Sequence, residues 1–340
     1  MWNTFKFLTF WVVIFAISVH FKPSECISHA VSDGDWLQYK LTYGKTYATT
    51  QADALARYYY SYNLKLIKKH NQNYDRKLTT FTLKANQFTD MRLTQFNALF
   101  PPAVYPTMTF DFPLNTVQNP PATFNPFTDQ GLVSEVEDQG ILCNSGWAYS
   151  AAKSIEILQQ YQGTLIPLSA QNLIDCSGRS TACRTQVPQT GFDYLTMYDQ
   201  VIYSTTDYPN NITISEQNMC IIPPAPITGT KLSAYSVITD GDDATMLRYV
   251  GNNYPVVIEF NPTSFEFMHY ADGVFQQPRT STGSHFMVVL GYEEDATSGL
   301  NTWLVQNSFG KTWGKGGRIS IRRDAVTPLA KHAIFPAELA

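Results

Sequence analysis

The chain has 340 residues, of which 44% are hydrophobic and 15% are charged, so it is long and apolar enough to fold around a sizeable core. This composition excludes a disordered chain. The formal net charge of −4 comes without a run of basic residues, which gives no reason to expect nucleic acid as a partner.

The N-terminus carries a short apolar segment, residues 7–19, preceded by Lys6. The segment is short for a membrane span and fits the hydrophobic part of a secretory signal peptide, with a signal anchor as the alternative. We therefore expect a signal peptide over residues 1–18 and no membrane association after its removal.

Two helices are predicted next, over residues 35–47 and 52–71. Apolar and aromatic side chains recur there every three or four residues, which is the spacing of one helical face. The residues on these faces are Trp36, Tyr39 and Tyr43 in the first helix, which Gly44 is suited to end, and Leu55, Tyr59, Tyr62 and Leu66 in the second.

A linker is predicted over residues 96–120, which are rich in proline from Pro101 onward and lack helical periodicity. Beyond it, Trp147, Ala151, Ile155 and Leu158 form the stripe of an amphipathic helix that starts near residue 146. This helix is expected to be central to the second half of the chain.

Strands dominate the last part of the chain. The segments are β-branched or alternate in polarity, as expected for an antiparallel sheet or barrel, and they are residues 255–260, 285–292, 302–306 and 318–322. Helices followed by strands favour an α+β fold in two layers, with a cleft between the layers as the natural place for a site.

The cysteines suggest an oxidising compartment. Four of the five, Cys143, Cys176, Cys183 and Cys220, would form two disulfides there, and the sequence alone leaves three pairings open. The fifth, Cys26, follows the apolar leader. Asn211 opens an Asn-Ile-Thr sequon in a polar stretch, which is consistent with a glycosylated surface loop.

Residues 139–150, QGILCNSGWAYS, resemble the sequence around the nucleophile of papain-like cysteine peptidases of the cathepsin type. The resemblance implies that Gly146 stands at the nucleophile position and Gln139 at the position of the oxyanion-stabilising side chain. It also implies that His285 corresponds to the catalytic base and Asn307 to the residue that orients it. Glycine has no side chain, so it cannot attack a carbonyl.

Other positions also depart from the family pattern. One extra residue between Gln139 and Trp147 is expected to displace the Gln139 side chain from the helix start. Phe309 replaces the tryptophan that covers the histidine and asparagine, and residues 184–186 replace a glycine-rich stretch that lets substrate approach.

The upstream helices resemble the inhibitory prosegments of the same family. The matching positions are Tyr60, Asn63, Ile67 and Asn71, followed by Asn86, Phe88 and Asp90, with Lys84 in place of a glycine. The resemblance further implies the disulfides Cys143–Cys183 and Cys176–Cys220.

The domain organisation implied by the resemblance is a signal peptide (1–18), a prosegment (30–95), a linker (96–120) and a papain-like domain (121–340). The domain would have a helical left half with the central helix and an antiparallel β-barrel right half. We expect an inactive, secreted or endolysosomal homologue that binds peptides, protease inhibitors or related peptidases. A monomer is expected, without cofactor or metal.

Two other functions remain open. An active cysteine-type endopeptidase, or a serine variant with Ser145 as nucleophile, would need that residue's reactive atom within about 3 Å of the His285 ring; Cys143 could be considered in the same role. A storage or structural protein is the third possibility. Such a protein would have no need for His285, Asn307 and Gln139 together. Their joint presence therefore favours a cleft that still has a function.

Overall fold

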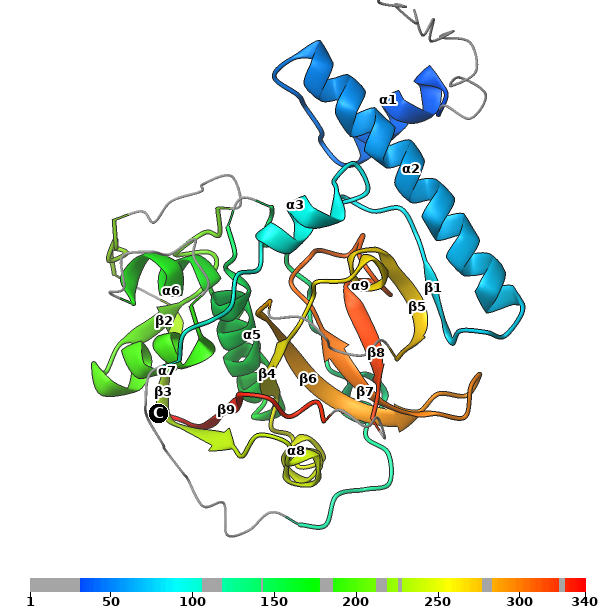
Figure 1. Ribbon diagram of the computed structural model, residues 1–340. Coiled ribbons are helices and arrows are strands. Elements are labelled where there is room, and N and C mark those ends of the chain that lie inside the picture. The colour runs from blue at the N-terminus through cyan, green and yellow to red at the C-terminus, as the bar shows by residue number, and fades with distance from the viewer. Residues whose placement is uncertain are drawn as a thin grey trace, which may run out of the picture.

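Figure 1 shows the computed structural model, in which part of the chain is described. The expected signal peptide, Cys26 and Cys183 lie outside the described residues. No helix in the described part is long and apolar enough to cross a membrane. The described residues are 31–105, 118–141, 143–177, 186–211, 219–225, 228–276, 283–323 and 328–340.

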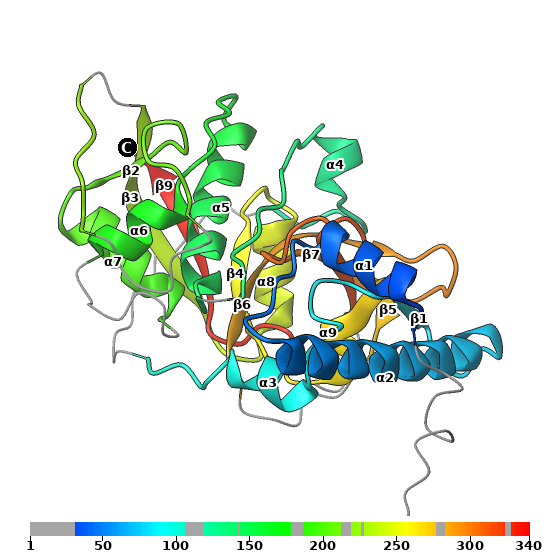
Figure 2. The ribbon, with the colours of Figure 1, turned by 90° about the horizontal axis from the view of Figure 1, so that it is seen from above.

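Helices α1 (Asp33–Thr42) and α2 (Thr50–Asp75) confirm the two helices predicted at the N-terminal side. Both begin at a hydroxyl N-cap, because Ser32 accepts from the amide of Asp35 and Thr49 accepts from that of Ala52. Figures 1 and 2 show the pair projecting from one side of the main body.

The packing face of α2 differs from the predicted stripe. Leu55 and Tyr62 are each 47% exposed, whereas Ala56, Asn63 and Ile67 are buried. The helix turns this second face toward the following loop because Asn63 bonds backbone carbonyls there. The face that packs therefore combines Ile67, which joins the main hydrophobic core, with the hydrogen bonds of Asn63.

The strands confirm all four predicted segments, as β4, β6, β7 and β8. They belong to one sheet of order β1-β5-β8-β7-β6-β4-β9-β3-β2, in which only the β5–β8 pair is parallel. The strands are β1 (Phe81–Leu83), β2 (Val201–Tyr203), β3 (Gly229–Ile238), β4 (Val256–Phe260), β5 (Tyr270–Phe275), β6 (His285–Glu294), β7 (Asn301–Gln306), β8 (Arg318–Arg322) and β9 (Ala333–Leu339).

The edge strand β1 comes from the predicted prosegment and pairs with β5, with Phe81 opposite Gly273. Gly273 is required there, because a Cβ atom would lie 2.3 Å from the carbonyl oxygen of Thr80. The following helix α3 (Leu93–Ala98) runs past residue 95, where the prosegment was expected to end. Through β1, the predicted prosegment thus adds an edge strand to the sheet of the main body.

The central helix is α5 (Gly146–Tyr161), which packs against β6 and confirms the prediction for this segment. Its residues are buried from Gly146 to Gln159, since it lies inside the molecule between the sheet and two shorter helices. Figure 1 shows α5 and the helices around it on the left, and β1, β5, β7 and β8 on the right with α1 and α2 above them, so the α+β expectation is confirmed. The other helices are α4 (Pro126–Asp129), α6 (Ala170–Cys176), α7 (Pro188–Met197), α8 (Asp243–Val250) and α9 (Phe265–His269).

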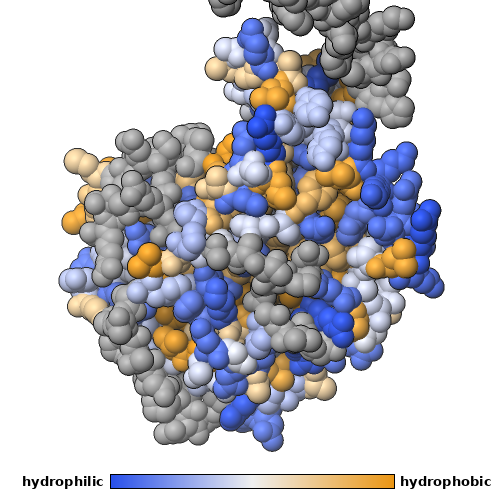
Figure 3. All heavy atoms as spheres, in the orientation of Figure 1, coloured by the Kyte–Doolittle hydropathy of each residue, from blue (hydrophilic) through white to orange (hydrophobic). Residues whose placement is uncertain are grey.

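The core of the described residues consists of two large hydrophobic clusters and a small one between α1 and α2. One large cluster fills the strand-rich half, with Trp303 and Trp313 fully enclosed, and the other surrounds α5. On the face in Figure 3, hydrophobic and hydrophilic side chains are interspersed. The candidate site lies at the start of α5.

Candidate functional site

His285 and Asn307 meet because they lie at the ends of neighbouring antiparallel strands. His285 is the first residue of β6, and Asn307 follows the last residue of β7. Nε2 of His285 lies 2.6 Å from Oδ1 of Asn307, which also accepts from the backbone amide of Ser308 at 2.7 Å. Because Oδ1 is an acceptor, Nε2 must donate, and in the neutral ring Nδ1 carries the free lone pair.

Aromatic rings enclose this imidazole. Phe309 stacks on it with centroids 4.7 Å apart. Phe100, from the segment after α3, meets it edge-on with centroids 5.3 Å apart. Burial lowers the pKa of His285 to about 4, although the bond to Asn307 opposes that shift. The ring is therefore neutral at neutral pH.

Gly146 begins α5 directly beside the ring. A Cβ atom at this residue would lie 2.7 Å from both Cε1 and Nδ1 of His285 and 3.1 Å from Oε1 of Gln139. Among the described residues, none forms a hydrogen bond with Nδ1 of His285. The imidazole thus occupies the space that a side chain on residue 146 would need.

The Gln139 amide is turned so that its oxygen faces this space. Its Nε2 donates to the carbonyl of Cys143 at 3.3 Å, while Oε1 accepts from Oγ of Ser308 at 2.7 Å. The opposite amide orientation would bring two oxygens together at Cys143. An oxyanion requires hydrogen-bond donors, so Gln139 does not offer one to the space beside Gly146 in this arrangement.

Ser145 is buried immediately before α5, but its hydroxyl does not cap the helix. It does not bond Nδ1 of His285 either, since that atom has no partner within the described part of the chain. The serine therefore lacks the contact with a base that would activate it.

The structure describes three of the four predicted disulfide cysteines and the predicted glycosylation site. Cys176 and Cys220 form a disulfide, and Cys143 is also disulfide-bonded; its expected partner Cys183 lies outside the described residues. Asn211 is exposed at the surface. Within the described ranges, no group of three or more histidine, cysteine or acidic residues could hold a metal ion.

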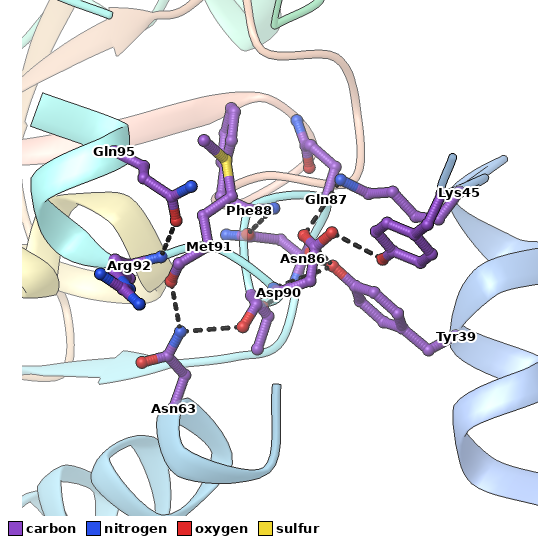
Figure 4. A network of polar contacts seen from close by, with 12 residues as sticks. Tyr39, Lys45, Asn63, Asn86, Gln87, Phe88, Asp90, Met91, Arg92 and Gln95 are labelled. Carbon is purple, nitrogen blue, oxygen red and sulfur yellow. Dashed lines mark hydrogen bonds and ion pairs between the residues drawn. The ribbon is translucent and has the colours of Figure 1, made fainter. Parts of the chain in front are cut away.

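Polar contacts join the loop after β1 to the main body beside the site. Figure 4 shows how the same loop is bonded to its neighbours within the prosegment region. Asn86 donates from Nδ2 to the carbonyl of Met268 at 2.8 Å, and Gln87 donates to that of Phe309 at 2.5 Å. Lys84, the residue in place of a glycine, donates from Nζ to the carbonyl of Gly314 at 2.7 Å. These contacts hold the loop against the residue that stacks on His285.

The same loop is fixed from its other side by Asp90. Its carboxylate accepts from the hydroxyls of Tyr39 and Tyr47, both at 2.8 Å, and pairs with Nζ of Lys45 at 3.0 Å. Asn63 bonds the carbonyls of Thr89 and Met91 at 2.8 and 2.9 Å.

Two residues that shape the site were not predicted from the sequence. Phe100 was part of a segment without periodicity, so nothing indicated that its ring would cover His285. Ser308 follows Asn307 directly, and its backbone and hydroxyl orient both Asn307 and Gln139. Its position beside a candidate residue was the only signal available.

Residues 120–337 match the family described as papain family cysteine protease, and residues 36–96 match the cathepsin propeptide inhibitor domain. Similar proteins include digestive cysteine proteinase 2 of Homarus americanus, 28% identical over 88% of this chain and 92% of that protein. Cathepsin M of Mus musculus is 29% identical over 90% of this chain and 92% of its own length.

Among solved structures, digestive procathepsin L2 proteinase from the larval midgut of Tenebrio molitor superimposes with a TM-score of 0.79. It is 27% identical in sequence, and the match covers 90% of this chain and 99% of that one. Digestive procathepsin L 3 of the same insect gives a TM-score of 0.78 at 27% identity, over 90% and 98% of the two chains.

Proposed function

The chain belongs to the papain family of cysteine proteases and carries the propeptide inhibitor domain of the cathepsins, and on this premise we propose that it has lost peptide cleavage and uses its cleft for binding. The relevant positions are Gly146 as the lost nucleophile, His285 and Asn307 as the former base and its orienting residue, and Gln139 as the former oxyanion donor.

The observation that carries this proposal is the position of the His285 ring. It lies where a Cβ on residue 146 would be, at 2.7 Å from two ring atoms. Real Cβ atoms do not approach other atoms so closely, hence the site is packed around a glycine. The space beside residue 146 is thus filled by the His285 ring.

Chemical reasoning on the other groups supports the same proposal. Catalysis by this family needs an activated nucleophile at the helix start and donors for the developing oxyanion. Gly146 has no nucleophilic atom, Gln139 directs its oxygen inward, and the burial of His285 favours its neutral form. The first two groups are unsuited to the reaction, and the neutral imidazole has no nucleophile at residue 146 to activate.

Binding remains chemically possible, because the cleft already holds an extended segment of this chain. Phe100 contacts His285, and Ala103 donates its amide to Oγ of Ser284 at 2.9 Å, next to the site. Peptides, protease inhibitors and related peptidases are the ligands we propose for the same surface. We further propose a route through the secretory pathway, to the outside of the cell or to lysosomes, where disulfides such as Cys176–Cys220 persist.

Covalent labelling tests this proposal. A sequence for a site-specific protease is inserted between residues 106 and 117 of the full chain, cut, and the product is treated at acidic and neutral pH with a peptidyl epoxide and a fluorophosphonate. These probes react with activated thiols and serines, and intact-mass measurement is expected to show no adduct. Procathepsin L2 of Tenebrio molitor, cut in its own linker, is the positive control for the epoxide.

An adduct that disappears in His285→Ala would contradict the proposal. If the adduct also disappears in Ser145→Ala, the chain is a hydrolase with a relocated serine nucleophile. Loss in Cys143→Ala would instead identify an activated thiol.

A further inference from the structure

A buried charge cluster lies beside Asn307, between α5 and the segment that precedes it. Its cation is Lys153 on α5, which donates from Nζ to Oε1 of Glu156 at 2.6 Å; the two side chains are 7% and 5% exposed. Oε2 of Glu156 accepts from the amide of Leu168 at 3.1 Å. The charge of Lys153 is therefore already balanced by a carboxylate that has a partner on each oxygen.

Glu137 adds a second carboxyl group to this cluster. Its Oε1 accepts from Nδ2 of Asn210 at 2.9 Å, whereas its Oε2 is buried and has no hydrogen-bond partner within the described ranges. The backbone fixes the residue in place, because the carbonyl of Glu137 accepts from the amide of Gly310 at 3.0 Å. The cluster thus combines two carboxyl groups with one ammonium group, so the carboxyl group of Glu137 lacks a counter-ion of its own.

The groups around Glu137 act on its protonation in opposite directions. Burial raises the pKa of Glu137, Lys153 lowers it, Glu156 raises it and the bond from Asn210 lowers it, and the result is about 7. Tyr149, the other titratable group of α5 near this carboxyl, is neutral because burial raises its own pKa. The Glu137 side chain is therefore protonated in acidic surroundings and ionised in alkaline ones.

A cavity of about 10 Å³ lies against Glu137 and the end of β7. It is lined there by Gln306, Asn307 and Ser308, which do not titrate, and by apolar side chains of β6. Gln306 is 3% exposed, and its Nε2 donates to the carbonyl of Glu135 at 3.3 Å. Oε1 of Gln306 and Nδ2 of Asn307 are both buried without a partner among the described residues. A cavity of this size holds at most one water molecule, so the groups that line it lie close together.

The three unpartnered atoms at this cavity do not match as donors and acceptors. Oε2 of Glu137 and Oε1 of Gln306 are acceptors, and only Nδ2 of Asn307 is a donor. A proton from solvent on Oε2 of Glu137 supplies the missing donor, because the new hydroxyl can donate to Oε1 of Gln306. The reverse orientation of the Gln306 amide does not help, since its oxygen would then face the carbonyl of Glu135.

We propose that Glu137 is a proton-binding site and that, once protonated, it donates to Gln306 and holds the segment before α5 against β7. Asn307, which orients His285, lines the same cavity. Proton binding therefore fixes the surroundings of His285 in acidic surroundings, and proton release loosens them. This inference goes beyond the proposed function, because it holds whether or not the cleft binds peptides.

The test compares the full chain with Glu137→Gln, in which an amide supplies the donor at every pH. A carboxyl group whose pKa is higher in the folded than in the unfolded chain stabilises the fold at low pH, and this contribution is lost as the pH rises toward 7. The folding equilibrium constant of wild type, divided by that of Glu137→Gln, should therefore fall by roughly thirtyfold between pH 5 and pH 7. The effect of His285 cancels in this ratio. With the control Glu135→Gln, at an exposed glutamate of the same segment, the ratio should change by less than twofold.

A second measurement needs no substitution. In NMR of the full chain, a glutamate carboxyl carbon should titrate with a midpoint between pH 6 and pH 8, and the side-chain amide signals of Gln306 should shift with the same midpoint. The absence of any glutamate that titrates above pH 6, or a constant ratio of wild type to Glu137→Gln, would overturn the proton site. A bridging water molecule would give that result, because it supplies donors at every pH. Signals of Gln306 that do not follow the titration would overturn the shared proton.

Discussion

The ring of His285 lies over the start of α5. It occupies space that a larger residue at position 146 would need for its side chain. Asn307 holds the ring from one side, and Phe309 and Phe100 enclose it from others. The ring cannot yield without breaking the bond to Asn307 or displacing an aromatic side chain. The glycine and the position of the ring are therefore two parts of one packing arrangement.

Gly146→Ala should consequently destabilise the protein. Adding one methyl group to a filled site typically costs about 1–3 kcal/mol, which exceeds the helix-propensity gain of alanine over glycine. The free energy of unfolding, measured with denaturant, should fall by that amount.

Gly34→Ala is the matched control, because Gly34 also lies in the first turn of a helix, and a Cβ there would meet only Oγ of Ser32 at 3.8 Å. This variant should be neutral or more stable by up to about 1 kcal/mol. Equal or greater stability of Gly146→Ala would show that the ring does not fill the space.

The buried imidazole also makes stability depend on pH. The pKa of His285 falls from the ordinary 6.5 to about 4 on folding, so between these values the unfolded chain binds more protons than the folded one. The contribution of the neutral ring to the free energy of unfolding is fully present above pH 6.5 and is lost as the pH falls toward 4. The loss is on the order of 3 kcal/mol.

Proton NMR of the His285 Cε1 signal checks this directly and should give a pKa below 5. His269 is a useful comparison, because burial lowers its pKa to about 4 as well. A value above 6 for His285 would mean that the ring is solvated or paired with a negative charge.

At the scale of elements, α2 and the loop after β1 depend on each other. Asn63 connects them by donating to two backbone carbonyls, and its side chain is buried. In Asn63→Ala both carbonyls would lose a partner, at a cost of about 1–3 kcal/mol for each one left buried and unsatisfied.

We expect hydrogen exchange in residues 86–98 to accelerate at least tenfold in Asn63→Ala, measured by mass spectrometry of peptides from the intact chain. Gln72→Ala, at an exposed position of the same helix, is the control and should leave exchange unchanged. Unaltered exchange in Asn63→Ala would show that other contacts hold the loop.

The elements differ in how far sequence could predict them. The start of α5 and the strands β4, β6, β7 and β8 follow from periodicity, because each buries a regular pattern of apolar residues. The face of α2 does not, since Leu55 and Tyr62 form as good an apolar stripe as the face that packs. The face is decided by the packing of Ile67 in the core and by the hydrogen bonds of Asn63 to the following loop, and the apolar pattern of α2 encodes neither partner.

For the molecule as a whole, the prosegment region is built into the sheet and onto the site. It supplies β1 at one edge, and Lys84 and Gln87 bond the main body. Family resemblance predicted a prosegment and the pairing of His285 with Asn307, but not the strand by which the prosegment region joins the sheet. It gave no indication of the cavity beside Glu137, because this residue and the end of β7 are distant in sequence and meet only in the folded chain.

The central claim is that the cleft binds peptides without cleaving them, and turnover of a fluorogenic peptide library tests it most directly. The chain is cut in the linker, and wild type and His285→Ala are compared at acidic and neutral pH, with cut procathepsin L2 of Tenebrio molitor as the positive control. We predict equal rates for wild type and His285→Ala, at the level of the buffer blank. A wild-type rate well above that of His285→Ala would contradict the account.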